Sequence, residues 1–194
     1  MRTALRWITF VSIVMMGQAI NAQNPSGQST DHDQDHQRHH DQVNDRGDHA
    51  MGFSHTKTTH HFRLTPEGGV IEVTANDAGD VASRNQIRQH LKHIALKFSE
   101  GDFSAPMFIH GENPPGVEVM KQLKAEIKYQ YEEIDRGAKV RISTNNEGAI
   151  KAIHEFLRFQ IKDHQTGDAI DVEKTAIFRP DMMMMEDVDT SSPV

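Results

Sequence analysis

The sequence predicts an α+β fold: a two-layer sandwich in which two ββα units form a four-stranded antiparallel sheet with both helices on one face. Within residues 51–167, apolar residues alternate over two strand-length segments and then recur at helical spacing, and this order occurs twice. Each unit alone is too small to enclose a core, so both are expected to pack on one shared sheet.

The first unit is expected to be a hairpin followed by a helix. Residues 60–65 and 70–75 form the two strands, and alternation places their apolar side chains on one face. The helix is expected to begin at Ser83, because Ser83 and Gln86 match the spacing of a capping box. Gly101 is the expected end of that helix.

The second unit repeats this plan. Residues 127–132 and 139–143 are the expected strands, and Thr144 and Glu147 match a second capping box. A helix with one apolar stripe follows and is expected to end before Gly167.

The segments between and after the units have less periodicity. Residues 101–116 contain three prolines and are expected to form an irregular loop, followed by a short helix at about 117–123. Residues 168–194 are acidic, include the run Met182–Met185, and are expected to be a mostly disordered tail.

Residues 1–22 have the pattern of a secretory signal peptide. Two arginines precede the apolar run 7–16, and small or polar residues follow it, which favours cleavage near Ala19 or Ala22. The apolar run is too short to cross a bilayer. We therefore expect a mature protein in the bacterial periplasm or outside the cell, with no stable membrane span after cleavage.

Residues 23–50 are rich in histidine and aspartate and have almost no apolar residues, so this arm is expected to be disordered. Imidazoles beside carboxylates are suitable ligands for Zn²⁺, Cu²⁺ or Ni²⁺. The alternative is an arm that serves only as a solubilising tether. The candidate metal ligands of the arm are His32, His36, His39, His40 and His49.

Four histidines of the domain are further candidate metal ligands. His90 and His93 are three residues apart on one helix flank. His60 shares the parity of the inward-facing strand residues, and His154 lies within the apolar face of the second helix. If both helices cover one sheet face, His60, His90 and His154 could form a three-nitrogen set. The alternative is that His154 is a core residue bonded to a backbone carbonyl and that His164 favours its helix C-terminus through the dipole.

Composition excludes several functional classes. The 194 residues include no cysteine, which rules out disulfides, thiolate zinc fingers, iron–sulfur clusters and a cysteine nucleophile. The net charge of −7 argues against a nucleic-acid partner. No signature of nucleophilic, metal-hydrolytic or nucleotide chemistry is present. Soft donors near Met107 and His110, with the run Met182–Met185, would suit Cu(I) better than Zn²⁺.

Three motifs resemble those of an uncharacterised family of small exported bacterial proteins. They are Thr-Thr-His-His-Phe at 58–62, the helix segment 87–95, and Ile-His-Glu-Phe-Leu-Arg-Phe-Gln-Ile-Lys-Asp-His at 153–164. The resemblance covers residues 51–168. Some members carry the automatic name aspartate carbamoyltransferase, but a core of about 120 residues without that enzyme's phosphate-binding signature does not support such an activity. The resemblance therefore implies a domain and no particular reaction.

These observations lead to one main functional hypothesis and two alternatives. The main hypothesis is an exported, non-catalytic protein that binds a divalent transition metal, Zn, Cu or Ni, through the arm and a histidine cluster on the domain. The first alternative is a small structural or interaction domain with an envelope protein as its partner. The second is a histidine-dependent enzyme that uses His90 or His154.

Overall fold

The computed structural model describes residues 27–172, and the side chains of residues 34–172. The predicted signal peptide and the run Met182–Met185 lie outside this range. The elements in chain order are α1 (Gly27–Met51), η1 (His55–Lys57), β1 (Thr58–Thr65), β2 (Gly68–Ala75), α2 (Val81–Glu100), α3 (Ser104–His110), α4 (Val117–Gln122), η2 (Lys124–Glu126), β3 (Lys128–Ile134), β4 (Gly137–Ser143) and α5 (Glu147–Asp163).

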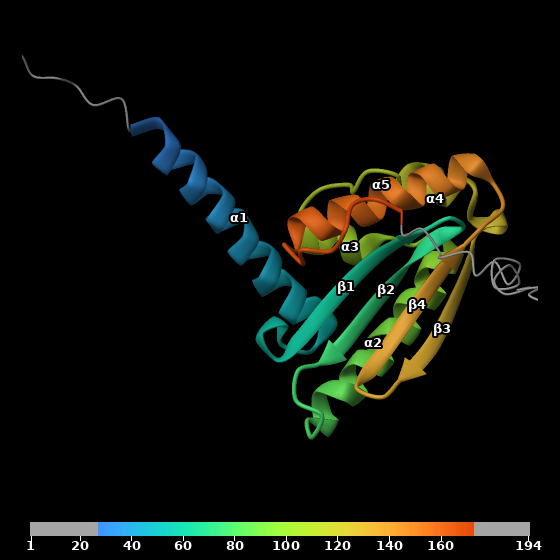
Figure 1. Ribbon diagram of the computed structural model, residues 1–194, viewed down its shortest axis with the longest axis horizontal. Coiled ribbons are helices and arrows are strands. Elements are labelled where there is room, and N and C mark those ends of the chain that lie inside the picture. Colours follow the sequence, from blue (N-terminus) through green and yellow to red (C-terminus); the bar gives the residue numbers. More distant parts are fainter. Residues whose placement is uncertain (1–26, 173–194) are drawn as a thin grey trace, which may run out of the picture.

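The predicted α+β class and four-stranded antiparallel sheet are confirmed (Figure 1). The strand order is β1-β2-β4-β3, and every neighbouring pair is antiparallel. One row of paired residues crosses the whole sheet, from Phe62 through Ile71 and Val140 to Tyr131. The two hairpins of the repeated units therefore lie side by side, with β2 and β4 in the centre.

Helices α2 and α5 cover the same face of the sheet, and each packs on the hairpin of the other unit. Helix α2 of the first unit packs mainly on β3 and β4, whereas α5 of the second unit packs on β1 and β2. The rings of Phe98 on α2 and Phe156 on α5 meet edge to face, with centroids 5.9 Å apart. The opposite sheet face is polar and includes the Arg63–Glu72 ion pair. The crossing of the helices brings side chains of both units together.

The helix starts differ from the two predicted capping boxes. Asp80, not Ser83, caps α2, because its carboxylate accepts hydrogen bonds from the backbone N–H and the hydroxyl of Ser83. A carboxylate at this position is also favoured by the helix dipole. Asn146 caps α5 by accepting from the Ala149 N–H at 3.1 Å, and Thr144 accepts from the Asn146 N–H.

The expected irregular loop contains a helix, α3. Pro106 lies in its first turn, where a proline does not interrupt any intrahelical hydrogen bond. Gly111, with φ 72°, ends it in the left-handed conformation. The short helix predicted at 117–123 is present as α4.

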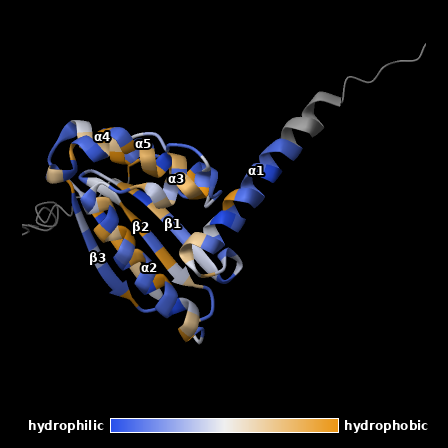
Figure 2. Ribbon diagram, turned by 180° about the vertical axis from the view of Figure 1, so that it is seen from behind, coloured by the Kyte–Doolittle hydropathy of each residue, from blue (hydrophilic) through white to orange (hydrophobic). Residues whose placement is uncertain are grey.

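The expectation of a disordered arm is wrong for residues 27–50, which form α1. This helix is almost entirely hydrophilic (Figure 2), and its C-terminal half docks on the domain. Val43 is 0% exposed, and Arg46 Nε donates to the Ile109 carbonyl at 2.6 Å. Polar side chains, rather than apolar ones, make most of the attachment, so the low apolar content of this segment does not prevent it from being ordered.

The start of the expected disordered tail is also ordered. Asp168 accepts hydrogen bonds from the Phe62 N–H at 2.9 Å and from His61 Nδ1 at 2.8 Å, and the Ile170 carbonyl accepts from Arg158 Nε of α5 at 2.9 Å, so this segment is attached to β1 and α5. No helix between residues 27 and 172 is both long and apolar enough to span a bilayer.

Gly116, at the contact between α4 and α5, is expected to tolerate substitution less well than Gly167. It has φ 83°, and a Cβ there would lie 2.1 Å from the Ala152 carbonyl oxygen. Gly167 has a similar φ of 74° but nothing within 4 Å. Gly167→Ala should therefore cost only about 1–2 kcal/mol of backbone strain. Gly116→Ala should lower the free energy of unfolding by a further ~1–3 kcal/mol from overpacking.

Urea unfolding of both variants and the parent measures this difference. Equal losses for the two variants would contradict the close contact between α4 and α5.

Candidate functional site

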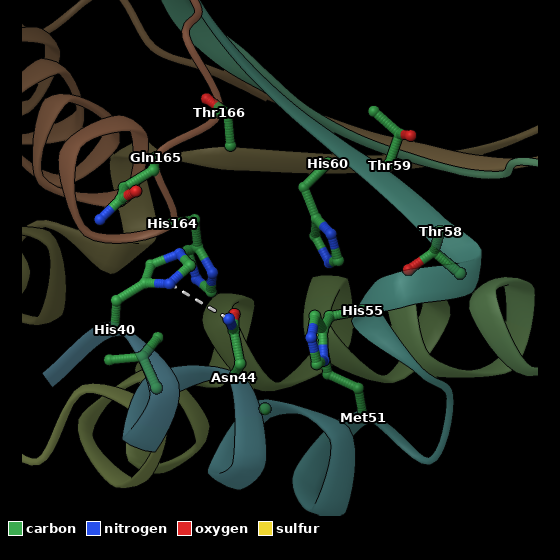
Figure 3. A pocket seen from close by; sticks show the side chains of 12 residues that line it. His40, Asn44, Met51, His55, Thr58, Thr59, His60, His164, Gln165 and Thr166 are labelled. Carbon is green, nitrogen blue, oxygen red and sulfur yellow. Dashed lines mark hydrogen bonds between the residues drawn. The ribbon is translucent and has the colours of Figure 1, made fainter. Parts of the chain in front are cut away.

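Three neighbouring cavities lie where α1 docks on the domain. The histidine cleft, of about 300 Å³, is bounded by α1, η1, β1 and the end of α5, and four imidazoles line it (Figure 3). The inner cavity, of about 60 Å³, is mostly apolar and extends into the core. The α1–α2 groove, of about 460 Å³, lies between the end of α1 and the exposed flank of α2. The four histidines of the cleft are His40, His55, His60 and His164.

His60 faces inward from β1, as its parity with Phe62 predicts, and lines both the cleft and the inner cavity. Its ring stacks on Phe53 and on His164, with centroids 6.1 and 5.7 Å apart. Its Nε2 atom is buried and has no hydrogen-bond partner. Burial lowers the pKa of His60 to about 4, so the imidazole is neutral at neutral pH.

His164 ends α5 and lies parallel to His60, with an angle of 2° between the rings. Burial, together with the nearby His60 and His110, lowers the pKa of His164 to about 3. A neutral ring cannot act as the cation expected at this helix C-terminus. The His164 side chain instead lines both the cleft and the inner cavity.

The position of His55 in the cleft was not predicted from the sequence. Asp48 Oδ1 accepts from the His55 backbone N–H at 2.6 Å and from His55 Nδ1 at 3.0 Å. When Nδ1 carries the proton, Nε2 of His55 is left with its lone pair available. His40, on α1, accepts at Nδ1 from the Asn44 amide, 3.3 Å away (Figure 3).

A second group, of two histidines and one carboxylate, links the helices around the cleft. Asp163 binds His110 Nδ1 with one carboxylate oxygen and His39 Nε2 with the other, the latter at 2.8 Å. Burial opposes ionisation of Asp163, but these hydrogen bonds outweigh it and hold the pKa of the carboxyl below its usual value. His110, only 2% exposed, also contacts Gln160 Oε1 at 2.9 Å. Helices α1, α3 and α5 therefore meet at Asp163.

The structure brings together only part of the predicted three-nitrogen set. His60 and His90 both line the inner cavity, and the Phe53 ring contacts each of them. His154 is remote: its Nε2 donates to the Thr65 carbonyl at 2.9 Å, near the far end of β1, which is the core role given as the alternative. Ten residues of helix separate it from His164, a distance of about 15 Å.

The other predicted ligands are distributed along α1 and α2. His49 shares the α1–α2 groove with His90 and His93. His36 lies on the exposed outer part of α1, and the side chain of His32 is outside the described residues. Within residues 34–172, no three His, Asp or Glu side chains already stand around one point as metal ligands.

Comparison with known proteins adds no relative: no protein-family model, curated protein or solved structure matches the chain. The resemblance based on the sequence motifs stays a prediction.

The free energy of unfolding is expected to fall as the pH drops from about 6.5 to about 4. In the unfolded chain, histidines take up protons near pH 6.5, whereas folded His60 and His90 do so at about 4 and folded His164 at about 3. The neutral rings therefore contribute stability fully above pH 6.5 and lose it as the pH falls. Each such group adds about 1.4 kcal/mol per pH unit to the slope.

Urea unfolding at about pH 7, 6 and 5 measures this slope. His164→Gln should reduce it, whereas His49→Gln, at an exposed position, should leave it unchanged. A stability independent of pH across this window would refute the burial of neutral imidazoles.

Proposed function

We propose that this protein binds a divalent transition-metal ion, Zn²⁺, Cu²⁺ or Ni²⁺, in the histidine cleft, as a non-catalytic binding protein. The observation that carries the proposal is the buried, unpartnered Nε2 of His60, a residue that lines a cleft with three further imidazoles. A buried polar atom without a partner costs about 1–3 kcal/mol, and coordination of a metal removes that cost.

The protonation states of the cleft support metal binding. Burial keeps His60 and His164 neutral, and only the neutral imidazole is a metal ligand. The Asp48–His55 pair adds a second supporting feature. Histidines that bind metals commonly donate their other ring N–H to a carboxylate, which sets the tautomer and holds the ring in place.

Binding requires the side chains to rearrange, because no three His, Asp or Glu side chains of residues 34–172 form a group that could hold a metal ion as they stand. Each belongs to a different element: His40 to α1, His55 to η1, His60 to β1 and His164 to the end of α5. Rotation of an imidazole between staggered side-chain conformations is fast compared with binding. The ion would therefore draw the four elements together and hold α1 on the domain.

The remaining histidines of α1 fit an auxiliary role in this proposal. His36 lies on the exposed outer part of the helix, and His49 faces the α1–α2 groove beside His90 and His93. These side chains would collect metal weakly and raise its local concentration near the cleft.

Export through cleavage of residues 1–22 is part of the same proposal. Expression in a Gram-negative host and intact-mass analysis of the periplasmic fraction test it. The expected product begins after Ala19 or Ala22. An uncleaved chain that stays in the cytoplasm would contradict export without affecting the cleft.

Calorimetric titration of the full chain with Zn²⁺ tests the metal site. His60→Phe keeps the aromatic stacking but removes the nitrogen, so it should abolish the tightest binding phase. Asp48→Asn should weaken that phase by about 10–100-fold, because it loosens His55. The matched control, Asp45→Asn, changes an exposed carboxylate of the same helix and should leave it unchanged.

Circular dichroism confirms that each variant is folded before titration. An affinity no tighter than about micromolar in the parent chain would refute the proposed function. So would tight binding that His60→Phe does not change.

A further inference from the structure

We infer that Met51 is a ligand of the same site and that it makes the site prefer copper, as Cu(I), over Zn²⁺; this inference rests on the proposed function. Met51 is the last residue of α1 and is half-buried. It lines the histidine cleft, the inner cavity and the α1–α2 groove. Its side chain therefore lies where the three cavities meet.

The other methionines among residues 27–172 have different surroundings. Met120 is 0% exposed and belongs to the hydrophobic core, and Met107 is 37% exposed on α3 and lines none of the three cavities. Of these three methionines, Met51 is the one that lines the three cavities where α1 docks, and imidazoles line each of them too. Met51 also packs against the hydrophobic core, so its side chain lies between the core and these cavities.

Gly47, one helical turn earlier, leaves room for the Met51 side chain. A Cβ on Gly47 would lie 3.2 Å from the terminal methyl carbon of Met51. A glycine inside a helix costs about 1 kcal/mol relative to alanine, so its presence in α1 needs a reason. Gly47 also lines the cleft, which places the Met51 methyl group beside that space.

The donor set of the cleft suits a soft ion of low charge. Thioether sulfur is a soft ligand that selects Cu(I), whereas imidazole binds both copper and zinc. No Asp, Glu, Lys or Arg side chain of the described residues lines the cleft. The four imidazoles and the thioether are uncharged donors, and the Asp48 carboxylate reaches the cleft only through its hydrogen bonds to His55. A monovalent ion is therefore easier to transfer there than a dication, because the cost of burying charge rises steeply with its magnitude.

Competition with the chromogenic chelator bicinchoninate, under anaerobic conditions with ascorbate, measures Cu(I) affinity in the full chain. Parallel calorimetry measures Zn²⁺. Met51→Leu removes the sulfur with little change in volume and should weaken Cu(I) binding by about tenfold or more, with no comparable change for Zn²⁺. Met107→Leu is the matched control and should change neither metal.

The outcomes separate this inference from the proposed function. If Met51→Leu leaves Cu(I) affinity unchanged, or weakens both metals equally, the ligand role of Met51 is overturned while the cleft stands as a metal site. If the parent chain binds Zn²⁺ no more tightly than about micromolar, the proposed function itself fails, whatever Met51→Leu does to Cu(I) binding. Thermal unfolding of each variant shows whether a loss of binding reflects a loss of folding.

Discussion

The carboxylate of Asp163 is the point on which the arrangement of the helices depends. It stands at the end of α5 and accepts a hydrogen bond from α3 through His110 and another from α1 through His39. These bonds tie together segments separated by 53 and 124 residues. Without this contact, α1 would keep the Arg46 and Asp48 hydrogen bonds and the packing of Val43 as its main attachments. The cleft exists because this helix is held beside β1.

The crossing of the two units explains how the cleft draws on both. Helix α5 of the second unit covers β1 and β2 of the first, so its C-terminal His164 stacks on His60. Had each helix covered its own hairpin, these rings would lie on opposite halves of the sheet. The same crossing leaves His154 over the far end of β1, bonded to Thr65. A repeated sequence pattern thus produces an asymmetric cleft.

The imidazoles around the inner cavity are costly for stability. His60, His90 and His164 are neutral because burial disfavours their charged forms, and His60 has a buried nitrogen without a partner. A sequence selected only for stability would place apolar side chains here, as it does at Phe62 and Ile94. Groups with strongly shifted pKa values that gather beside a cavity are typical of functional sites. The stability lost by burying these imidazoles supports the proposal that this region, rather than the exposed histidines, is the functional one.

The sequence by itself determined the sheet, the two long helices and the inward direction of His60. These features repeat every two or every 3.6 residues, so a short window contains them. Only the tertiary structure decided the rest: that residues 27–50 form a docked helix, that Asp80 and Asn146 are the caps, and that His55, His110 and His164 join His60. The two caps are local contacts over three residues, but several polar residues near each helix start could have made them. The docking of residues 27–50 depends on pairs such as His39 with Asp163, and the attachment of residue 168 on His61 with Asp168, which are more than 100 residues apart. Contacts of this range leave no periodic pattern in the sequence, because they are set by how the finished elements pack.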